Sequence, residues 1–137
     1  YDADTTGTNR IKNLSARNRV GTGADILIAG FVVAGSGNES LLIRGVGPTL
    51  FDSFGIADRL IDPKLEIYDS TGAKIAENDN WNAALVSVFT QVGAVALTAG
   101  SKDAALQISL PPGAYTAQVS GVNGSTGEAL VEVYEVK

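Results

Sequence analysis

Short apolar segments separated by turn residues run along most of this chain. In residues 113–122, Tyr115, Ala117 and Val119 alternate with polar residues, and residues 103–110 alternate in the same way. Such alternation places apolar side chains on one face of a strand and polar side chains on the other. Turns such as GSGN, STGA and NGSTG separate the segments, and glycine and small polar residues are typical of turns between strands. The pattern predicts an all-β protein.

Two of the predicted strands are apolar on both faces. In residues 24–35, one face carries Ile26, Ile28 and Val32, and the other carries Leu27, Phe31 and Val33. In residues 128–136, Val131 and Val133 oppose Leu130, Tyr134 and Val136. A strand that is apolar on both faces must be covered on both. Two interpretations stay open: residues 48–63 and 83–93 of the same chain cover the second face, or another subunit covers it.

The remaining segments complete a single β-sandwich. Hairpins are predicted at residues 24–47 and 64–79, and residues 48–63 are predicted to form a long, partly buried connection. Leu85, Val88, Phe89 and Val92 fall at helical spacing, which predicts one short helix. We therefore expect a jelly-roll-like sandwich of about seven to eight strands with at most one short helix. It would span residues 13–137, behind a polar amino-terminal arm of residues 1–12.

Composition narrows the possible functions. The net charge of −5 argues against nucleic acid as a partner. No apolar run approaches the roughly 20 residues of a membrane helix, so we expect no membrane insertion. The chain contains no cysteine and no histidine, which removes the commonest nucleophiles, bases and transition-metal ligands and weighs against an enzyme. It also contains no methionine, so we expect a processed or partial product, most simply one that has lost a signal peptide.

Two segments resemble a known family. The pieces LEIYDSTGAKIAENDNW (residues 65–81) and SLPPGAYTAQVSGVNGSTGEALVEVYEV (residues 109–136) are similar to the bacterial pre-peptidase carboxyl-terminal domains. These domains share a strand–turn–strand, an Asn/Asp-rich step, a PPGxY turn and a closing strand. The resemblance implies a jelly-roll-like β-sandwich, export from the cell and an accessory role without catalytic activity. Some members bind calcium or an extracellular polymer, but the family has no common catalytic residues to transfer to this chain.

The stretch ENDNW at residues 77–81 is the best candidate for a compact binding site. Calcium prefers six to eight oxygen ligands, and Glu77 and Asp79 offer two on one side, with Asp103 as a distant third. Consecutive side chains of an extended segment point to opposite faces, which divides the oxygens of the stretch. The alternatives are a turn with Trp81 as a core anchor, which we favour, and a sugar-binding platform on Trp81. Apart from this calcium hypothesis, we expect no cofactor.

The leading functional hypothesis is a non-enzymatic, secreted or cell-surface protein that binds copies of itself, as in a filament. In β-strand addition, residues 1–20 of one copy would pair with an exposed edge at residues 26–33 or 130–136 of the next. The residues predicted for self-association are Ile11, Leu14, Val20, Ile26, Ile28, Phe31, Val33, Leu130, Tyr134 and Val136.

Charge and fold leave further alternatives. The basic Arg10, Lys12, Arg17 and Arg19 contrast with the acidic Glu128, Glu132 and Glu135. These are either scattered surface charges or the two sides of a head-to-tail contact. The runner-up function is an accessory or adhesive module for an extracellular polysaccharide or protein, with calcium as a structural ion.

Overall fold

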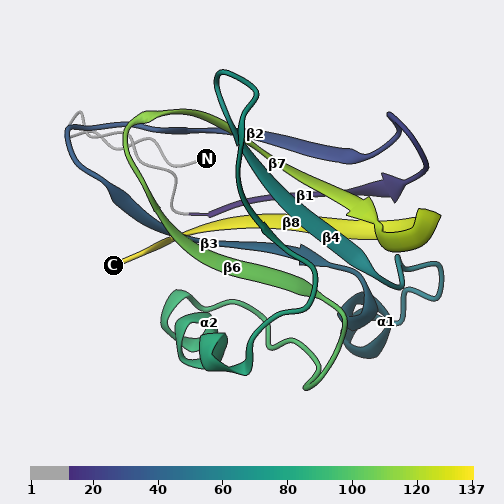
Figure 1. The fold of residues 1–137 in the computed structure, drawn as a ribbon. Coiled ribbons are helices and arrows are strands. Elements are labelled where there is room, and N and C mark those ends of the chain that lie inside the picture. The colour runs from purple at the N-terminus through teal and green to yellow at the C-terminus, as the bar shows by residue number, and fades with distance from the viewer. Residues whose placement is uncertain (1–12) are drawn as a thin grey trace.

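The chain folds into two packed antiparallel sheets with helices on one side. The computed structural model describes residues 13–137, and residues 1–12 lie outside the described part. The first sheet, here called the covered sheet, contains β1 (Asn13–Val20), β8 (Gly127–Val136), β3 (Glu39–Val46) and β6 (Ala104–Leu110), in that order. The second, here called the open sheet, contains β2 (Leu27–Val33), β7 (Gly113–Gly121), β4 (Pro63–Asp69) and β5 (Lys74–Asn78). Figure 1 shows both α-helices on the side of the covered sheet that faces away from the open sheet.

The strand order is that of a jelly roll. Strands pair as β1 with β8, β2 with β7, β3 with β6 and β4 with β5, as expected when a long hairpin is wound into a sandwich. The predicted all-β, jelly-roll-like sandwich is therefore confirmed. The predicted hairpin at residues 64–79 is the β4–β5 hairpin, which has an irregularity between Ile67 and Tyr68. The predicted hairpin at residues 24–47 is wrong, because β2 and β3 lie in different sheets.

The main core fills the space between the two sheets. Its members are the inward-facing residues of both, among them Leu27, Phe31, Val33, Ile43, Leu65, Ile67, Val119, Val131 and Val133. The rings of Phe31 and Tyr115 stack with their centroids 5.6 Å apart. Each such side chain contributes about 1.5–3 kcal/mol on burial, so this layer supplies most of the stabilisation.

A second apolar cluster covers the outer face of the covered sheet. It joins Leu42, Val46 and Tyr134 of the strands to Leu50, Phe89 and Leu97. Leu50 belongs to α1 (Pro48–Phe54), and Phe89 belongs to α2 (Val86–Val92), which follows the 3₁₀ turn η1 (Ala83–Leu85). A further 3₁₀ turn, η2 (Val122–Gly124), precedes β8. The doubly apolar β8 is thus covered by its own chain, as the first interpretation predicted.

The helix count differs from the prediction. The helix predicted in residues 83–93 is present as α2, but residues 48–63 contain a second helix, α1. Proline is favourable at the first helical position, and Pro48 occupies the start of α1. Gly55 then ends the helix in the left-handed conformation (φ 70°), which glycine adopts without strain. In residues 13–137 no helix has the length and apolar character needed to cross a membrane.

A buried ion pair lies between α2 and the covered sheet. The Arg44 side chain is 2% exposed, and its Nη2 lies 2.7 Å from Oε1 of Glu132. Arg44 also donates to the Val95 carbonyl (2.7 Å) and lies 4.9 Å from the Phe89 ring centroid. The Tyr134 hydroxyl donates to Glu132 Oε2 (2.5 Å), and burial, together with this bond, raises the pKa of Tyr134. Glu132 is therefore an internal residue.

Candidate interaction surface on the open sheet

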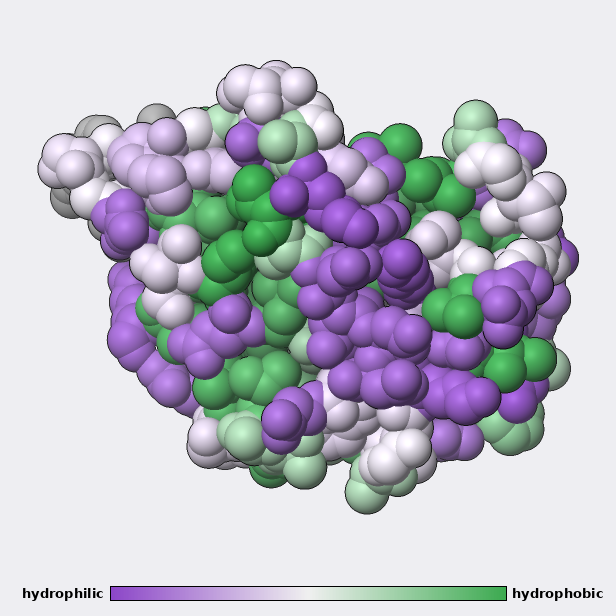
Figure 2. Space-filling view, viewed as in Figure 1, coloured by the Kyte–Doolittle hydropathy of each residue, from purple (hydrophilic) through white to green (hydrophobic). Residues whose placement is uncertain are grey.

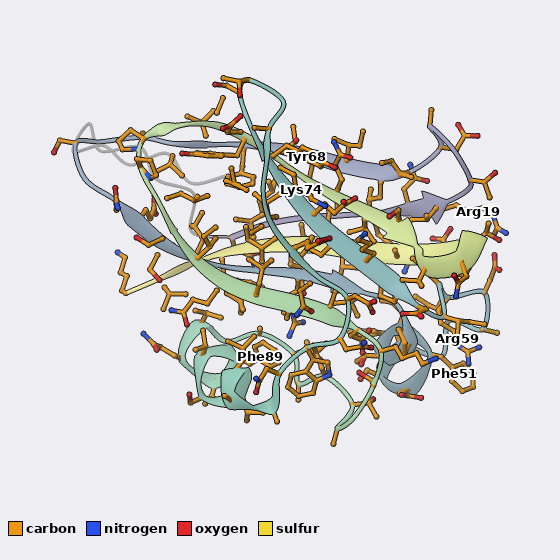
Figure 3. All side chains as sticks on the ribbon, viewed as in Figure 1. Arg19, Phe51, Arg59, Tyr68, Lys74 and Phe89 are labelled. Carbon is orange, nitrogen blue, oxygen red and sulfur yellow. The ribbon has the colours of Figure 1, made fainter. Side chains whose placement is uncertain are left out.

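The outer face of the open sheet lacks the cover that the other sheet has. Ile28 and Val32 point outward from β2 and are 52% and 58% exposed, whereas their neighbours Phe31 and Val33 are buried. Figure 3 shows Tyr68 and Lys74 on the side of the sandwich opposite to Phe89 of α2. Within residues 13–137, the doubly apolar β2 keeps one apolar face open. Exposed apolar side chains grouped on a sheet face are typical of interaction sites.

The edge of β2 is also open in the described part of the chain. β2 pairs with β7 on one side and with no other described strand. Its seven residues, LIAGFVV, contain no charged residue and no proline. Proteins protect exposed strand edges with charges, proline, bulges or covering segments. β2 has none of these devices among the described residues.

The other three edge strands are protected. β1 carries the exposed Arg17 and Arg19, and β5 carries Lys74 and Glu77 beside the irregularity in the β4–β5 pairing. β6 is as uncharged as β2, but the last residue of β5 covers the start of its edge, because the Ala105 N–H donates to Asn78 Oδ1 (3.1 Å). The contrast makes β2 the acceptor edge best suited to strand addition among residues 13–137.

Charged residues occupy the opposite half of the open face. Lys64 and Lys74 each pair with Glu77, at 3.4 and 3.3 Å, and Lys74 also lies 3.3 Å from Glu66. These contacts lower the pKa of Glu77, chiefly through Lys74, and raise the pKa of Lys74, chiefly through Glu77. Figure 2 shows the result as a hydrophilic band over β4. An apolar edge and a charged band therefore share one sheet face.

A hollow of about 540 Å³ lies between the β4–β5 turn and β7. It is lined by Tyr68, Asp69, Ser70, Gly72, Ala114, Tyr115, Thr116 and Gln118. The turn is held by Asp69, whose Oδ1 accepts from the Thr71 N–H (2.9 Å), the Thr71 hydroxyl (2.6 Å) and the Ala73 N–H (3.1 Å). The bonds from Thr71 and Ala73 lower the pKa of Asp69. The hollow combines the ring of Tyr68, and part of the buried Tyr115, with hydroxyl and amide groups.

The three residues of the calcium hypothesis lie in different environments. Glu77 pairs with lysines on the open face, and Asp79 lies in the bend after β5. Asp103 is fully buried next to α1. Residues 13–137 contain no group of three or more Asp and Glu side chains placed to hold a metal ion. Calcium binding by these residues stays a prediction.

Asp103 instead joins several segments. Its Oδ1 accepts from the Gly47 N–H (2.7 Å) and the Thr49 N–H (3.3 Å) at the start of α1. Its Oδ2 accepts from the hydroxyls of Thr49 and Ser101, both at 2.5 Å. A carboxylate at a helix start satisfies N–H groups that have no partner within the helix. Asp103 thus holds α1 against the start of β6.

The stretch ENDNW matches the turn-and-anchor interpretation. The Trp81 ring packs on Phe89 with centroids 5.3 Å apart, and its Nε1–H donates to Ser101 Oγ (3.1 Å). Asn82 caps η1 through Oδ1, which accepts from the Ala84 N–H (2.8 Å). The tryptophan therefore belongs to the apolar cluster under the helices rather than to an exposed platform.

The residues predicted for self-association are dispersed. Ile28 is exposed, and Leu14, Ile26, Leu130 and Val136 are partly buried. Val20, Phe31, Val33 and Tyr134 are buried within the chain. Ile11 lies outside the described residues. β8 pairs with β1 on one side and β3 on the other, so residues 130–136 have no free edge, and we do not retain them as an acceptor.

The head-to-tail charge hypothesis stays a prediction, and its Arg10 and Lys12 lie outside the described residues. Arg17 lies 3.5 Å from Glu128 of the same chain. Arg19, which Figure 3 labels at the end of β1, pairs with Asp58. Glu132 pairs with Arg44, and Lys137 lies 3.5 Å from Glu135. Arg17 lies close to Glu128 because the jelly roll brings β1 beside β8.

Comparison with known proteins shows the fold. The crystal structure of the pre-peptidase C-terminal domain of a collagenase from Bacillus anthracis is similar, with a TM-score of 0.50 and 12% sequence identity. The similarity covers 91% of this chain and 98% of that chain. This chain has the PPC-like β-sandwich fold. No family model matches the sequence, and no curated protein sequence matches it. The PPC-like fold predicted from residues 65–81 and 109–136 is confirmed.

Two features of the PPC-like sandwich escaped sequence reasoning. Val32 lies on the same face as Ile28 and is the more exposed of the two, but the residues predicted for self-association do not include it. Its period-two spacing from Ile28 was the available signal. The hollow beside Tyr68 depends on the pairing of β4 with β7, which places Thr116 opposite Tyr68 and Gln118 opposite Glu66. These strands are far apart in the sequence, so no local pattern indicates the hollow.

Proposed function

We propose that this chain is a non-enzymatic extracellular domain that associates with copies of itself by β-strand addition at β2. The observation that carries the proposal is the uncharged β2 edge, beside which Ile28 and Val32 stay exposed. A strand added there pairs with backbone groups of β2 and covers both side chains. Burial of the exposed part of two such side chains stabilises the complex by about 1–3 kcal/mol in addition to the new hydrogen bonds.

Composition and fold support the rest of the proposal. The sequence has no histidine and no cysteine, so the usual nucleophile–base pairs are absent. An extracellular location fits the likeness to a domain of a collagenase. A contact between an edge on one copy and a different segment on the next is heterologous, and it grows an open fibre unless the rotation closes a ring.

A charged substitution on the β2 edge tests the proposed association. Val32→Lys places a cation on the acceptor edge, and Val86→Lys is its matched control, because Val86 is 51% exposed on α2. We expect light scattering to give a mass that rises with concentration for the natural chain and the control. Val32→Lys should stay monomeric. A natural chain that is monomeric at every concentration would overturn the proposal.

A second candidate function rests on the hollow beside Tyr68. An aromatic ring next to Thr116 and Gln118 suits an extracellular polysaccharide or peptide, since a ring supplies apolar area and the neighbours supply hydrogen bonds. This candidate predicts a monomer that is retained on a polymer column. Tyr68→Ala should then abolish retention, whereas Tyr68→Phe, which keeps the ring, should retain most of it.

A further inference from the structure

The geometry of β2 defines what an added strand must look like. The inward-facing Phe31 and Val33 are already buried, and the exposed apolar groups are Ile28 and Val32 on the open face. Side chains of neighbouring strands share faces in register. A donor strand with uncharged side chains on the open-face side covers Ile28 and Val32 without burying a charge against them.

The first twelve residues of the chain have this pattern. The sequence YDADTTGTNRIK places every charged residue at an even position, namely Asp2, Asp4, Arg10 and Lys12. The odd positions carry Tyr1, Ala3, Thr5, Gly7, Asn9 and Ile11. In an extended segment these two sets lie on opposite faces. The segment has no proline, so each of its residues after the first can take part in a ladder of backbone hydrogen bonds.

The length of this segment also suits the edge. β2 has seven residues, so seven donor residues, about 23 Å of strand, pair with its full length. The other five residues before Asn13 span up to about 17 Å.

Strand direction favours a donor from a second copy. β1 and β2 run in opposite directions in Figure 1, joined by the tight turn in which the Gly21 N–H donates to the Asp25 carbonyl (2.6 Å). If residues 1–12 paired with β2 of their own chain, they would have to run parallel to β2 in order to lead into β1. A neighbour's segment can pair antiparallel, which is the more stable arrangement per residue and the commoner one.

We propose that residues 1–12 of one copy pair antiparallel with β2 of the next copy. In this complex, Tyr1, Ala3, Thr5 and Gly7 lie on the side of Ile28 and Val32. Asp2 and Asp4 lie on the side of Phe31 and Val33, but beyond the edge strands β2 and β1 of the two described sheets. The inference rests on the proposed function and identifies the donor. β1 itself is not part of the donor, because it pairs with β8 of its own chain along its whole length.

Two single substitutions in the full chain test the donor and its facing. Thr5→Lys and Thr6→Lys add the same charge at adjacent positions, but only Thr5 belongs to the uncharged face. Light scattering should show that Thr5→Lys weakens assembly at least tenfold, whereas Thr6→Lys assembles like the natural chain. Equal behaviour of the two variants would overturn the assigned face.

Mixing two deficient chains separates the donor from the acceptor. The chain of residues 13–137 keeps β2 but lacks the donor, and the Val32→Lys chain keeps the donor but lacks the acceptor edge. Each should be monomeric alone, and together they should form a one-to-one complex. If residues 13–137 assemble as well as the full chain, the donor assignment fails while association at β2 stands. If Val32→Lys assembles unchanged, the proposed function itself fails.

Discussion

Removal of the Asp103 carboxylate tests how the PPC-like sandwich holds its helical side. The Asp103→Ala substitution leaves the Gly47 and Thr49 N–H groups without their acceptor at the buried start of α1. Asp103 is fully buried, so water cannot readily replace it. The hydroxyls of Thr49 and Ser101 also lose their partner, but they can rotate towards other groups.

The expected loss of stability follows from the two N–H groups that are left without an acceptor. Each buried donor without a partner costs about 1–3 kcal/mol, so the substitution should lower the free energy of unfolding by about 2–6 kcal/mol. A domain of this kind has a total of about 5–15 kcal/mol. For a chain of this length, at about 3–4 °C per kcal/mol, the melting temperature should fall by about 6–24 °C.

The assay is thermal unfolding by circular dichroism, with Asp69→Ala as the matched control. Asp69 also accepts three hydrogen bonds, but it lies in an exposed turn. Water can hydrate the Thr71 and Ala73 donors after its removal, so the control should lose far less stability. A melting temperature for Asp103→Ala within about 3 °C of the natural chain, or equal losses in both variants, would refute the reasoning.

Two further predictions concern the ion pair under α2. Arg44→Met should destabilise the domain by about 3–5 kcal/mol in urea unfolding, because it leaves Glu132 buried without its cation. The double variant with Glu132→Leu should regain much of that loss, and no recovery would argue against the pair. The pKa of Tyr134 is raised above its ordinary 10.0 in the fold. The protonated hydroxyl therefore contributes fully to the free energy of unfolding below about pH 10, and this contribution is lost as the pH rises further. Tyr134→Phe should therefore make the free energy of unfolding less sensitive to pH between about pH 9 and about pH 12, and an unchanged pH slope would count against this origin.

The difference between β2 and β8 marks the limit of what the sequence predicts. Both strands are apolar on both faces, and periodicity treats them alike. The cover over β8 comes from α2, whose Phe89 joins Tyr134 in one cluster across 45 positions of sequence (134 − 89). β2 has no such partner among residues 13–137. Local patterns reveal that a face needs cover, but the topology decides whether the chain supplies it.

Asp103 shows the same limit at a single residue. The sequence marks it as a carboxylate before an apolar strand, and calcium chemistry was a reasonable use for it. Its donors lie 56 and 54 positions earlier, at Gly47 and Thr49, so no local pattern reveals them. Conversely, the β4–β5 hairpin, α2 and the Trp81 anchor were predictable, because each depends on residues close together in sequence.

Backbone amide hydrogen exchange of β2 tests the central claim most directly. The claim is that the outward N–H groups of residues 27–33 pair with a strand from another copy. The account predicts that these amides exchange more slowly as protein concentration rises, while the exposed turn at residues 70–72 is unchanged. Exchange in β2 that is independent of concentration, in a sample that light scattering shows to be assembled, would contradict it.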